Sequence, residues 1–365
     1  MKKIVPILIL TVCLLFVPAT AQNVKVAVDF KSAKAITDAL AKNKISEAEI
    51  EKIADLEGNR ELIKKMTSLG LKDSEKVFKK TLREIIQNGK VGGEDYFKWN
   101  LVRQNLKEIN ALTTRIEREK SALLADLNQI ISDYTPADLQ ADVKARLLVG
   151  GNSLGFLNDN DPALNIALHK IGDDFEGLKY LLAHELYHSI EAVGDEQRKQ
   201  KLPRSNAAPP VNIANAYTVA FNVYNEGAAT FVGDFTKIKN PLAFTSNRQA
   251  EYEKNARRMR QNFALFEALL FRAYHDPSAD VNQLYSVAFT TSFEESGYYV
   301  GYRMAEIIEK YEGKAAIADL VNKNPLEFFK KYIEIYKKYD EPRAMKFSPA
   351  VEKILLAMQV WNDKL

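Results

Sequence analysis

The chain has 365 residues, a formal net charge of +3 and four histidines. A balance this close to neutral, without a basic block interleaved with aromatic residues, gives no support to nucleic-acid binding. A chain of this length is long enough to bury a large hydrophobic core, so its stability does not depend on disulfides.

Residues 1–21 have the composition of a secretory signal peptide. Two lysines form a basic start, residues 4–17 form an apolar core, and Ala19 and Ala21 satisfy the small-x-small rule for cleavage. We therefore expect a secreted or periplasmic protein; an uncleaved membrane anchor is the alternative, which the short apolar core disfavours. Cys13, the single cysteine, leaves with this segment, which excludes cysteine-protease chemistry and cysteine-ligated zinc. No second apolar stretch of the sequence is long enough to span a bilayer.

The segment from residue 28 to residue 134 predicts several helices. Apolar residues recur there with helical periodicity, interrupted by glycines. The clearest stretches are 33–40, 46–56, 74–87 and 96–134, the last as one long helix or two. We assign residues 22–135 to a helical N-terminal subdomain, which fits either a scaffold or one wall of a substrate cleft.

Pro136 marks a change of pattern, and residues 136–365 are assigned to a second, zincin-like domain whose motif is described below. Three short apolar or alternating stretches follow Pro136, bounded by turn-forming residues, as is typical of strands. They cover residues 143–149, 154–157 and 163–168. The sequence therefore predicts a small sheet immediately before the next helix.

Residues 175–193 have helical periodicity and contain the motif H-E-x-x-H, at His184, Glu185 and His188. Histidines four residues apart lie on one face of a helix, so both imidazoles can reach one metal ion. Glu185 can hold and deprotonate the water molecule that the metal activates. The surrounding helix is strongly apolar, so unpaired histidine and glutamate side chains would be costly to bury there. The pattern predicts the zinc site of a peptidase, and two histidines carried by accident are the alternative.

A catalytic zinc ion usually takes three protein ligands, so a third donor is needed. The extension that would supply a third histidine is absent, because Glu191 and Gly194 stand where glycine and histidine are required. The remaining histidines are His169 and His275. Glu226 is the stronger candidate, since it lies in a long apolar run where an acidic side chain is costly unless paired or metal-bound. A glutamate bonded to a neighbouring Arg or Tyr is the alternative.

The rest of the chain also predicts helices. The run that contains Glu226 covers residues 213–235, and the small Gly227 would let this helix pass close to the H-E-x-x-H helix. Residues 194–210 are polar and predict a loop, whereas 247–275 predict one long helix. Further helices are expected over 292–320, 325–339 and 349–361.

The sequence H-E-L-Y-H, followed roughly forty residues later by N-E-G-A-A, resembles the gluzincin branch of zinc metallopeptidases. It is also similar to several bacterial families of exported zinc-dependent peptidases, over residues 141–329. The resemblance implies a catalytic domain in which His184, His188 and Glu226 hold Zn²⁺ and Glu185 is the general base.

The resemblance implies three further features. An edge strand before the metal helix pairs with the substrate backbone, and residues 163–168 are our candidate. A Tyr or His stabilises the oxyanion; Tyr298, in a G-Y-x-x-G-Y-R pattern, is the first choice, with Tyr302 and His275 as alternatives. Many gluzincins carry an aspartate that orients a ligand histidine, but Thr230 stands at that position, so this partner is unassigned. A simple packing role for the tyrosines is the alternative.

Together these features predict a predominantly helical α+β fold and an exported zinc peptidase that acts on peptide or protein substrates. Because the G-x-M-E-N signature that anchors a free amino terminus is absent, an endopeptidase is favoured. A catalytically inactive, metallopeptidase-like binding protein is the alternative. A ferritin-like di-metal oxidase would need a second E-x-x-H pair, but Ile166, Leu181 and Arg272, three residues before the other histidines, are not acidic.

Overall fold

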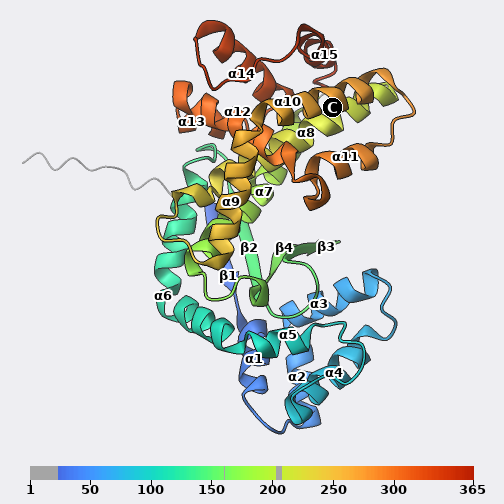
Figure 1. The fold of residues 1–365 in the computed structure, drawn as a ribbon, viewed down its shortest axis with the longest axis vertical. Coiled ribbons are helices and arrows are strands. Elements are labelled where there is room, and N and C mark those ends of the chain that lie inside the picture. The colour runs from blue at the N-terminus through green and yellow to red at the C-terminus, as the bar shows by residue number, and fades with distance from the viewer. Residues whose placement is uncertain (1–23, 160, 203–207) are drawn as a thin grey trace, which may run out of the picture.

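The computed structural model describes residues 24–159, 161–202 and 208–365. The predicted signal peptide, residues 1–21, lies outside the described residues. The described chain is mostly helical with one small four-stranded sheet, which confirms the predicted α+β class (Figure 1). None of the described helices is both long and apolar enough to cross a membrane.

The strands are β1 (Val24–Asp29), β2 (Ala141–Leu148), β3 (Gly155–Asn158) and β4 (Asp161–Ala167). The helices between β1 and β2 are α1 (Lys31–Leu40), α2 (Glu47–Ala54), α3 (Glu57–Ser68), α4 (Ser74–Asn88), α5 (Trp99–Gln104) and α6 (Leu106–Ser132). The helices after the sheet are α7 (Phe175–Lys201), α8 (Val211–Val232), α9 (Ala243–Arg257), α10 (Met259–His275), α11 (Val281–Phe289), α12 (Ser296–Glu312), α13 (Lys314–Ala318), α14 (Leu326–Lys338) and α15 (Pro349–Gln359).

The sheet has the strand order β1-β2-β4-β3. β1 and β4 both pair with β2 in parallel, and β3 folds back antiparallel onto β4. The three strands predicted after Pro136 are confirmed, and β1 is a fourth that the sequence analysis did not predict. Since β4 has a neighbour on each side, the prediction that residues 163–168 form an edge strand is wrong. The edge strand beside β4 is β3, because the short connection after Asn158 returns the chain as a hairpin.

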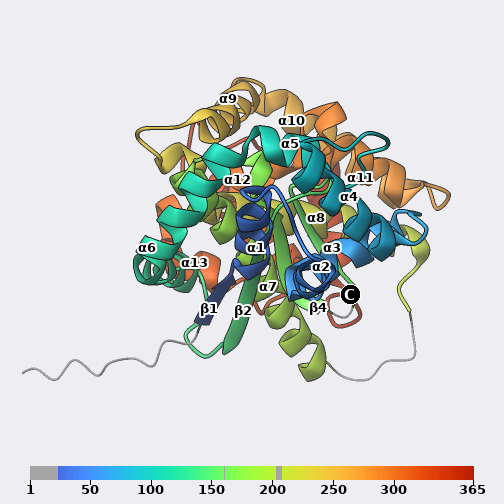
Figure 2. The ribbon, with the colours of Figure 1, turned by 90° about the horizontal axis from the view of Figure 1, so that it is seen from below.

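The sheet lies between two groups of helices. In Figure 1, α1 to α5 lie below the strands and α7 to α15 lie above them; Figure 2, seen from below, shows α1 and α2 in front of the strands. Helices α1 and α3 pack against β2, and α7 packs against β2 and β4. One cluster of buried apolar side chains runs from Val24 in β1 to Met358 in α15. Helix α7 is therefore held between the sheet and the C-terminal helices.

Helix α7 extends further than the sequence predicted. The prediction of a loop from Gly194 is wrong for the first residues, which continue the helix to Lys201. The polar residues of this segment pair along the helix: Asp195 lies 2.7 Å from Arg198 and 2.6 Å from Lys199. Such i,i+3 and i,i+4 pairs stabilise a polar helix end that an apolar pattern cannot reveal.

Two long helical stretches are each divided into two helices, and the second helix of the first stretch, α6, is also kinked at Glu119. Residues 96–134 form α5 and α6, which meet at Asn105, whose side chain donates a hydrogen bond to a backbone oxygen in the segment before α7. Residues 247–275, predicted as one helix, form α9 and α10, which meet at Arg258. One turn earlier, buried Asn255 donates a hydrogen bond to a backbone oxygen before α12. Both divisions adjoin an amide side chain that bonds to a distant segment, which local periodicity does not predict.

Helices α8 and α12 cross at two glycines. A Cβ atom built on Gly301 would lie 2.0 Å from the backbone oxygen of Val223, and one on Gly227 would lie 2.2 Å from the Cα of Gly301. Helix α8 does pack against the H-E-x-x-H helix, as predicted, but the predicted role of Gly227 in that contact is wrong, since Gly227 contacts α12. The close contact with α7 is made by Gly233, where a Cβ would lie 2.5 Å from the Cβ of His184.

We expect Gly301→Ala to lower the free energy of unfolding by about 1–3 kcal/mol, because the methyl group must push two backbones apart. Urea denaturation of the purified protein measures this. Gly92→Ala is the matched control, since a Cβ at Gly92 meets no atom within 4 Å. Equal stability of the two variants would show that the α8–α12 crossing does not require glycine.

Candidate metal centre

The H-E-x-x-H motif lies in the middle of α7, and Glu226 lies near the C-terminal end of α8. Asp174 is the N-cap of helix α7, and its carboxylate accepts a hydrogen bond from the backbone N–H of Gly177 at 2.8 Å. The same carboxylate accepts one from Thr245 in α9 at 2.9 Å. The start of the metal helix is thus tied to a helix from a distant part of the chain.

The structure brings together the three side chains that the sequence predicts as metal ligands. The Nε2 atoms of His184 and His188 lie 3.8 and 3.3 Å from Oε2 of Glu226. One donor atom from each residue lies within 4.8 Å of the others, and the two imidazole centres are 4.9 Å apart. Tetrahedral zinc, with ligand bonds of about 2.0–2.2 Å, needs donor atoms roughly 3.3–3.6 Å apart. Two imidazoles and one carboxylate in this arrangement therefore fit zinc.

The electrostatics of the cluster favour a cation between these side chains. Burial, and then the neighbouring His188, lowers the pKa of His184 to about 3, so its imidazole is neutral. Burial disfavours charge on His188 too, but Glu191 and Glu226 outweigh it and raise its pKa. Burial raises the pKa of the Glu226 carboxyl, yet the two histidines and a hydrogen bond from Tyr298 bring it below its usual value. A carboxylate and a neutral imidazole are the forms in which these side chains bind zinc.

His188 has a buried partner that the sequence analysis missed. Its Nδ1 lies 3.1 Å from Oε2 of Glu191, which also accepts a hydrogen bond from Asn225 at 2.6 Å. The Glu191 side chain is 4% exposed, and burial raises its pKa to about 7. A bond of this kind fixes the orientation of a ligating histidine. The signal in the sequence is the i,i+3 spacing from His188, which places both side chains on one helix face.

We expect Glu191→Gln to weaken zinc affinity by about 10- to 100-fold, because the charged partner that orients His188 is lost. Competition with a chromogenic chelator measures the affinity. Glu196→Gln is the control, since Glu196 is exposed on the same helix and bonds only to Gln200 among the described residues, at 3.2 Å. Equal zinc affinities of the two variants would argue against the orienting role.

Glu185 and Tyr298, predicted as catalytic residues, both lie beside the three donors. Glu185 is next to the edge strand β3, since a Cβ built on Gly155 would lie 3.4 Å from its Oε1. Burial raises the pKa of the Glu185 carboxyl, which suits a group that takes and releases a proton. The Tyr298 ring, on α12, is 6.3 Å from the His184 ring with an interplanar angle of 14°, and the Tyr298 hydroxyl contributes to the lowered pKa of Glu226.

Two other predicted positions make different contacts. The Tyr302 hydroxyl donates a hydrogen bond to Asp234 at 3.1 Å, and both residues are buried. Thr230 donates to the backbone oxygen of Glu226 at 2.7 Å, so it does not take the place of the aspartate found in many gluzincins. The backbone of the residue before Thr230 lies close enough to His184 to raise its pKa slightly, against the lowering by burial.

The remaining histidines do not join the cluster. His169 is buried, and its Nδ1 accepts a hydrogen bond from the backbone of Gly150 at 3.1 Å. Burial lowers its pKa to about 4, as expected of a neutral core histidine. His275, at the end of α10, packs against neighbouring aromatic rings and is not among the described residues that line the hollows beside the donors.

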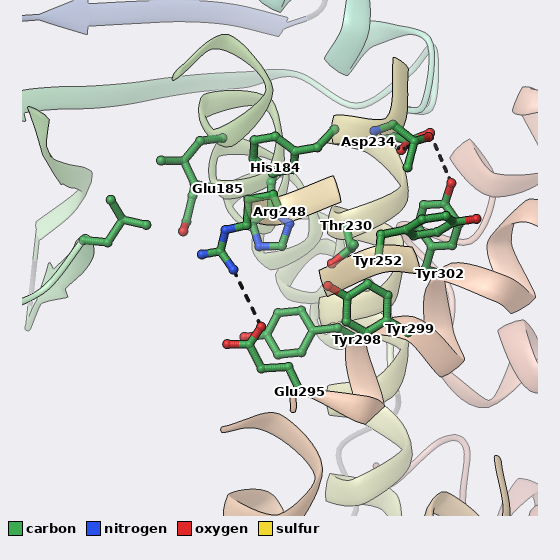
Figure 3. A pocket seen from close by; sticks show the side chains of 14 residues that line it. His184, Glu185, Thr230, Asp234, Arg248, Tyr252, Glu295, Tyr298, Tyr299 and Tyr302 are labelled. Carbon is green, nitrogen blue, oxygen red and sulfur yellow. Dashed lines mark hydrogen bonds and ion pairs between the residues drawn. The ribbon is translucent and has the colours of Figure 1, made fainter. Parts of the chain in front are cut away.

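Two hollows meet at Glu185, which lines both of them. The larger, about 1090 Å³, runs along α7 and is bordered by β3, His188 and Glu226. The smaller, about 130 Å³, lies on the His184 side, between α7, the end of α8, α9 and α12 (Figure 3). The three donors therefore lie where a long groove meets a small hollow. A ligand that fills both would extend across the three donors.

A protein-family model described as "Putative zinc dependent peptidase (DUF5700)" matches residues 50–341. The matched segment includes α7, α8 and α12, and with them the three donors, Glu185 and Tyr298. Comparisons with curated proteins and with solved structures give no match. Because the family match covers most of the chain, this protein belongs to that family of zinc-dependent peptidases.

Proposed function

We propose that the protein is an exported zinc metallopeptidase of the gluzincin type, with His184, His188 and Glu226 as the zinc ligands. The observation that carries the proposal is the convergence of two imidazoles and one carboxylate within 4.8 Å, beside the free carboxyl group of Glu185. Family membership supports peptide or protein substrates. Export rests on the composition of residues 1–21 alone.

The side chains around the cluster can carry out peptide hydrolysis. Zn²⁺ held by the three donors would supply Lewis acidity toward the scissile carbonyl and toward water. Glu185 accepts the proton of the attacking water and passes it to the amine nitrogen that leaves. The Tyr298 hydroxyl donates a hydrogen bond to the oxygen on which negative charge develops. The raised pKa of Glu185 favours the first of its proton transfers, because a more basic carboxylate takes the proton of water more readily.

The substrate chain is proposed to lie along β3 rather than along β4. β3 pairs on one side only, with β4, so its outer edge can add an extended peptide as a further strand. The larger hollow follows this edge, with Phe156 and Leu157 among its lining residues. Absence of the signature that anchors a free amino terminus favours cleavage within a chain, so an endopeptidase is proposed.

Metal analysis combined with cleavage profiling tests the proposal. We expect one zinc ion per purified chain, cleavage of a mixed peptide library detected by mass spectrometry, loss of cleavage with a chelator, and recovery on adding zinc. Cleavage that survives complete zinc removal would rule the mechanism out. One zinc ion per chain without any cleavage would favour the inactive binding-protein alternative. For export, sequencing of the mature amino terminus is expected to begin at Gln22.

A further inference from the structure

The small hollow beside His184 has one basic side chain among the described residues that line it, Arg248. This arginine comes from α9, a helix that carries none of the groups in the proposed mechanism. Its side chain is 30% exposed, although the helix is packed beside α7 and α12. Figure 3 shows its guanidinium directed toward Glu295, the residue before the first turn of α12.

The guanidinium of Arg248 is only partly engaged. Its Nη1 donates a hydrogen bond to Glu251 at 2.8 Å and lies 3.7 Å from Glu295, which is too far for a hydrogen bond. Within the described part of the chain, Nε and Nη2 have no hydrogen-bond acceptor. A guanidinium offers five N–H donors in a planar fork, so most of the donors of this lining residue are unused among the described residues.

Three carboxyl groups also line the hollow, those of Glu185, Asp234 and Glu295. Asp234 accepts hydrogen bonds from the Tyr302 hydroxyl at 3.1 Å and from Thr236 at 2.9 and 2.6 Å. Glu185 is assigned to the proton transfer. The Glu295 carboxylate makes no hydrogen bond among the described residues and lies 3.7 Å from Arg248. The unused Nε and Nη2 donors of Arg248 are therefore the groups that an anionic guest would bind, in competition with Glu295, and tyrosine rings form much of the remaining wall.

We infer that the small hollow is a subsite for a carboxylate of the substrate and that Arg248 is its anchor. The inference rests on the proposed peptidase function and names its substrate class. Arginine binds planar carboxylates with two parallel hydrogen bonds, which gives orientation as well as affinity. The volume of about 130 Å³ suits a single side chain or a chain end rather than a continuing peptide. The carboxylate belongs either to an Asp or Glu side chain next to the cleaved bond or to the carboxyl terminus.

Matched peptides distinguish the two sources. One pair carries Glu or Gln beside the cleaved bond, on each side in turn, and a second pair ends in a free acid or an amide. We expect the wild type to have a kcat/KM about 10- to 100-fold higher for the carboxylate member of one pair. The pair that shows the preference identifies the source. Equal values in all pairs would overturn the inference and leave the proposed function standing.

Variants of Arg248 test the anchor directly. Arg248→Met keeps the apolar stem, and we expect the carboxylate preference to fall to within about threefold, because the charge-assisted bonds are lost. Arg257→Met, on the same helix with a side chain 71% exposed, is the matched control and is expected to keep the preference. If Arg248→Met does not fold, Arg248→Lys, which loses the planar fork, is expected to lower the preference several-fold. An unchanged preference in either folded Arg248 variant overturns the anchor role, and a zinc-loaded wild type that cleaves no peptide overturns both proposals.

Discussion

Glu185→Gln is expected to lower kcat for peptide cleavage by roughly 10²- to 10⁴-fold, while the zinc content stays at the wild-type level. Glutamine has the same shape as glutamate but cannot take a proton from water. The side chain is not one of the three donors, so the metal cluster keeps its ligands. Cleavage of a fluorogenic peptide at saturating concentration gives kcat, and elemental analysis of the same sample gives the zinc content.

The control for this variant is Glu176→Gln, near the start of α7, where the side chain is 40% exposed and lines neither hollow. We expect it to keep both zinc and activity. A Glu185→Gln protein with at least half the wild-type kcat would show that another group moves the proton. A variant that loses zinc would show instead that Glu185 helps to hold the cluster together.

The spacing of residues along the chain predicts much of the arrangement that the candidate site has in the fold. The four-residue spacing of His184 and His188 fixes their common face whatever the rest of the chain does. Glu226 could be singled out because a carboxylate in an apolar helix needs a partner, and the structure places it 3.3 Å from His188. The pairing of Glu191 with His188 could also have been predicted from their three-residue spacing. In the sequence, Glu191 was considered only as the residue that stands where the extended zinc motif requires glycine.

Features set by contacts between distant segments were not predictable in the same way. β1 pairs with β2 across more than a hundred residues, and its six residues carry no signal of that partner. The edge strand is β3 and not, as predicted from the sequence, β4. The order of strands depends on which of them pair, whereas the alternation of apolar and polar residues indicates only that a strand exists. Gly227 indicated a close helix approach, but the sequence did not say that α12 was the partner. The role of Arg248 depends on α9 packing beside α7, which no spacing along the chain reveals.

Tyr298 and Tyr302 lie one turn apart on α12, and the structure gives a reason to choose between them. The Tyr302 hydroxyl donates a hydrogen bond to buried Asp234, whereas the Tyr298 ring lies beside His184 and its hydroxyl helps to lower the pKa of Glu226. In the free enzyme the Tyr298 hydroxyl is therefore already at the cluster. A donor in that place can turn to a developing oxyanion without a movement of the helix.

Tyr298→Phe is accordingly expected to lower kcat by about 10²- to 10³-fold, as the loss of one oxyanion donor does, with little change in KM. Phenylalanine keeps the ring beside His184, so the fold and the zinc content should not change. Tyr302→Phe is the matched comparison: it removes the bond to Asp234 and should cost about 1 kcal/mol of unfolding free energy while leaving kcat within a few-fold. The reverse pattern would assign the oxyanion contact to Tyr302. Two variants with wild-type kcat would mean that neither tyrosine makes it, and that the zinc ligands and Glu185 carry the rate acceleration without a hydroxyl from α12.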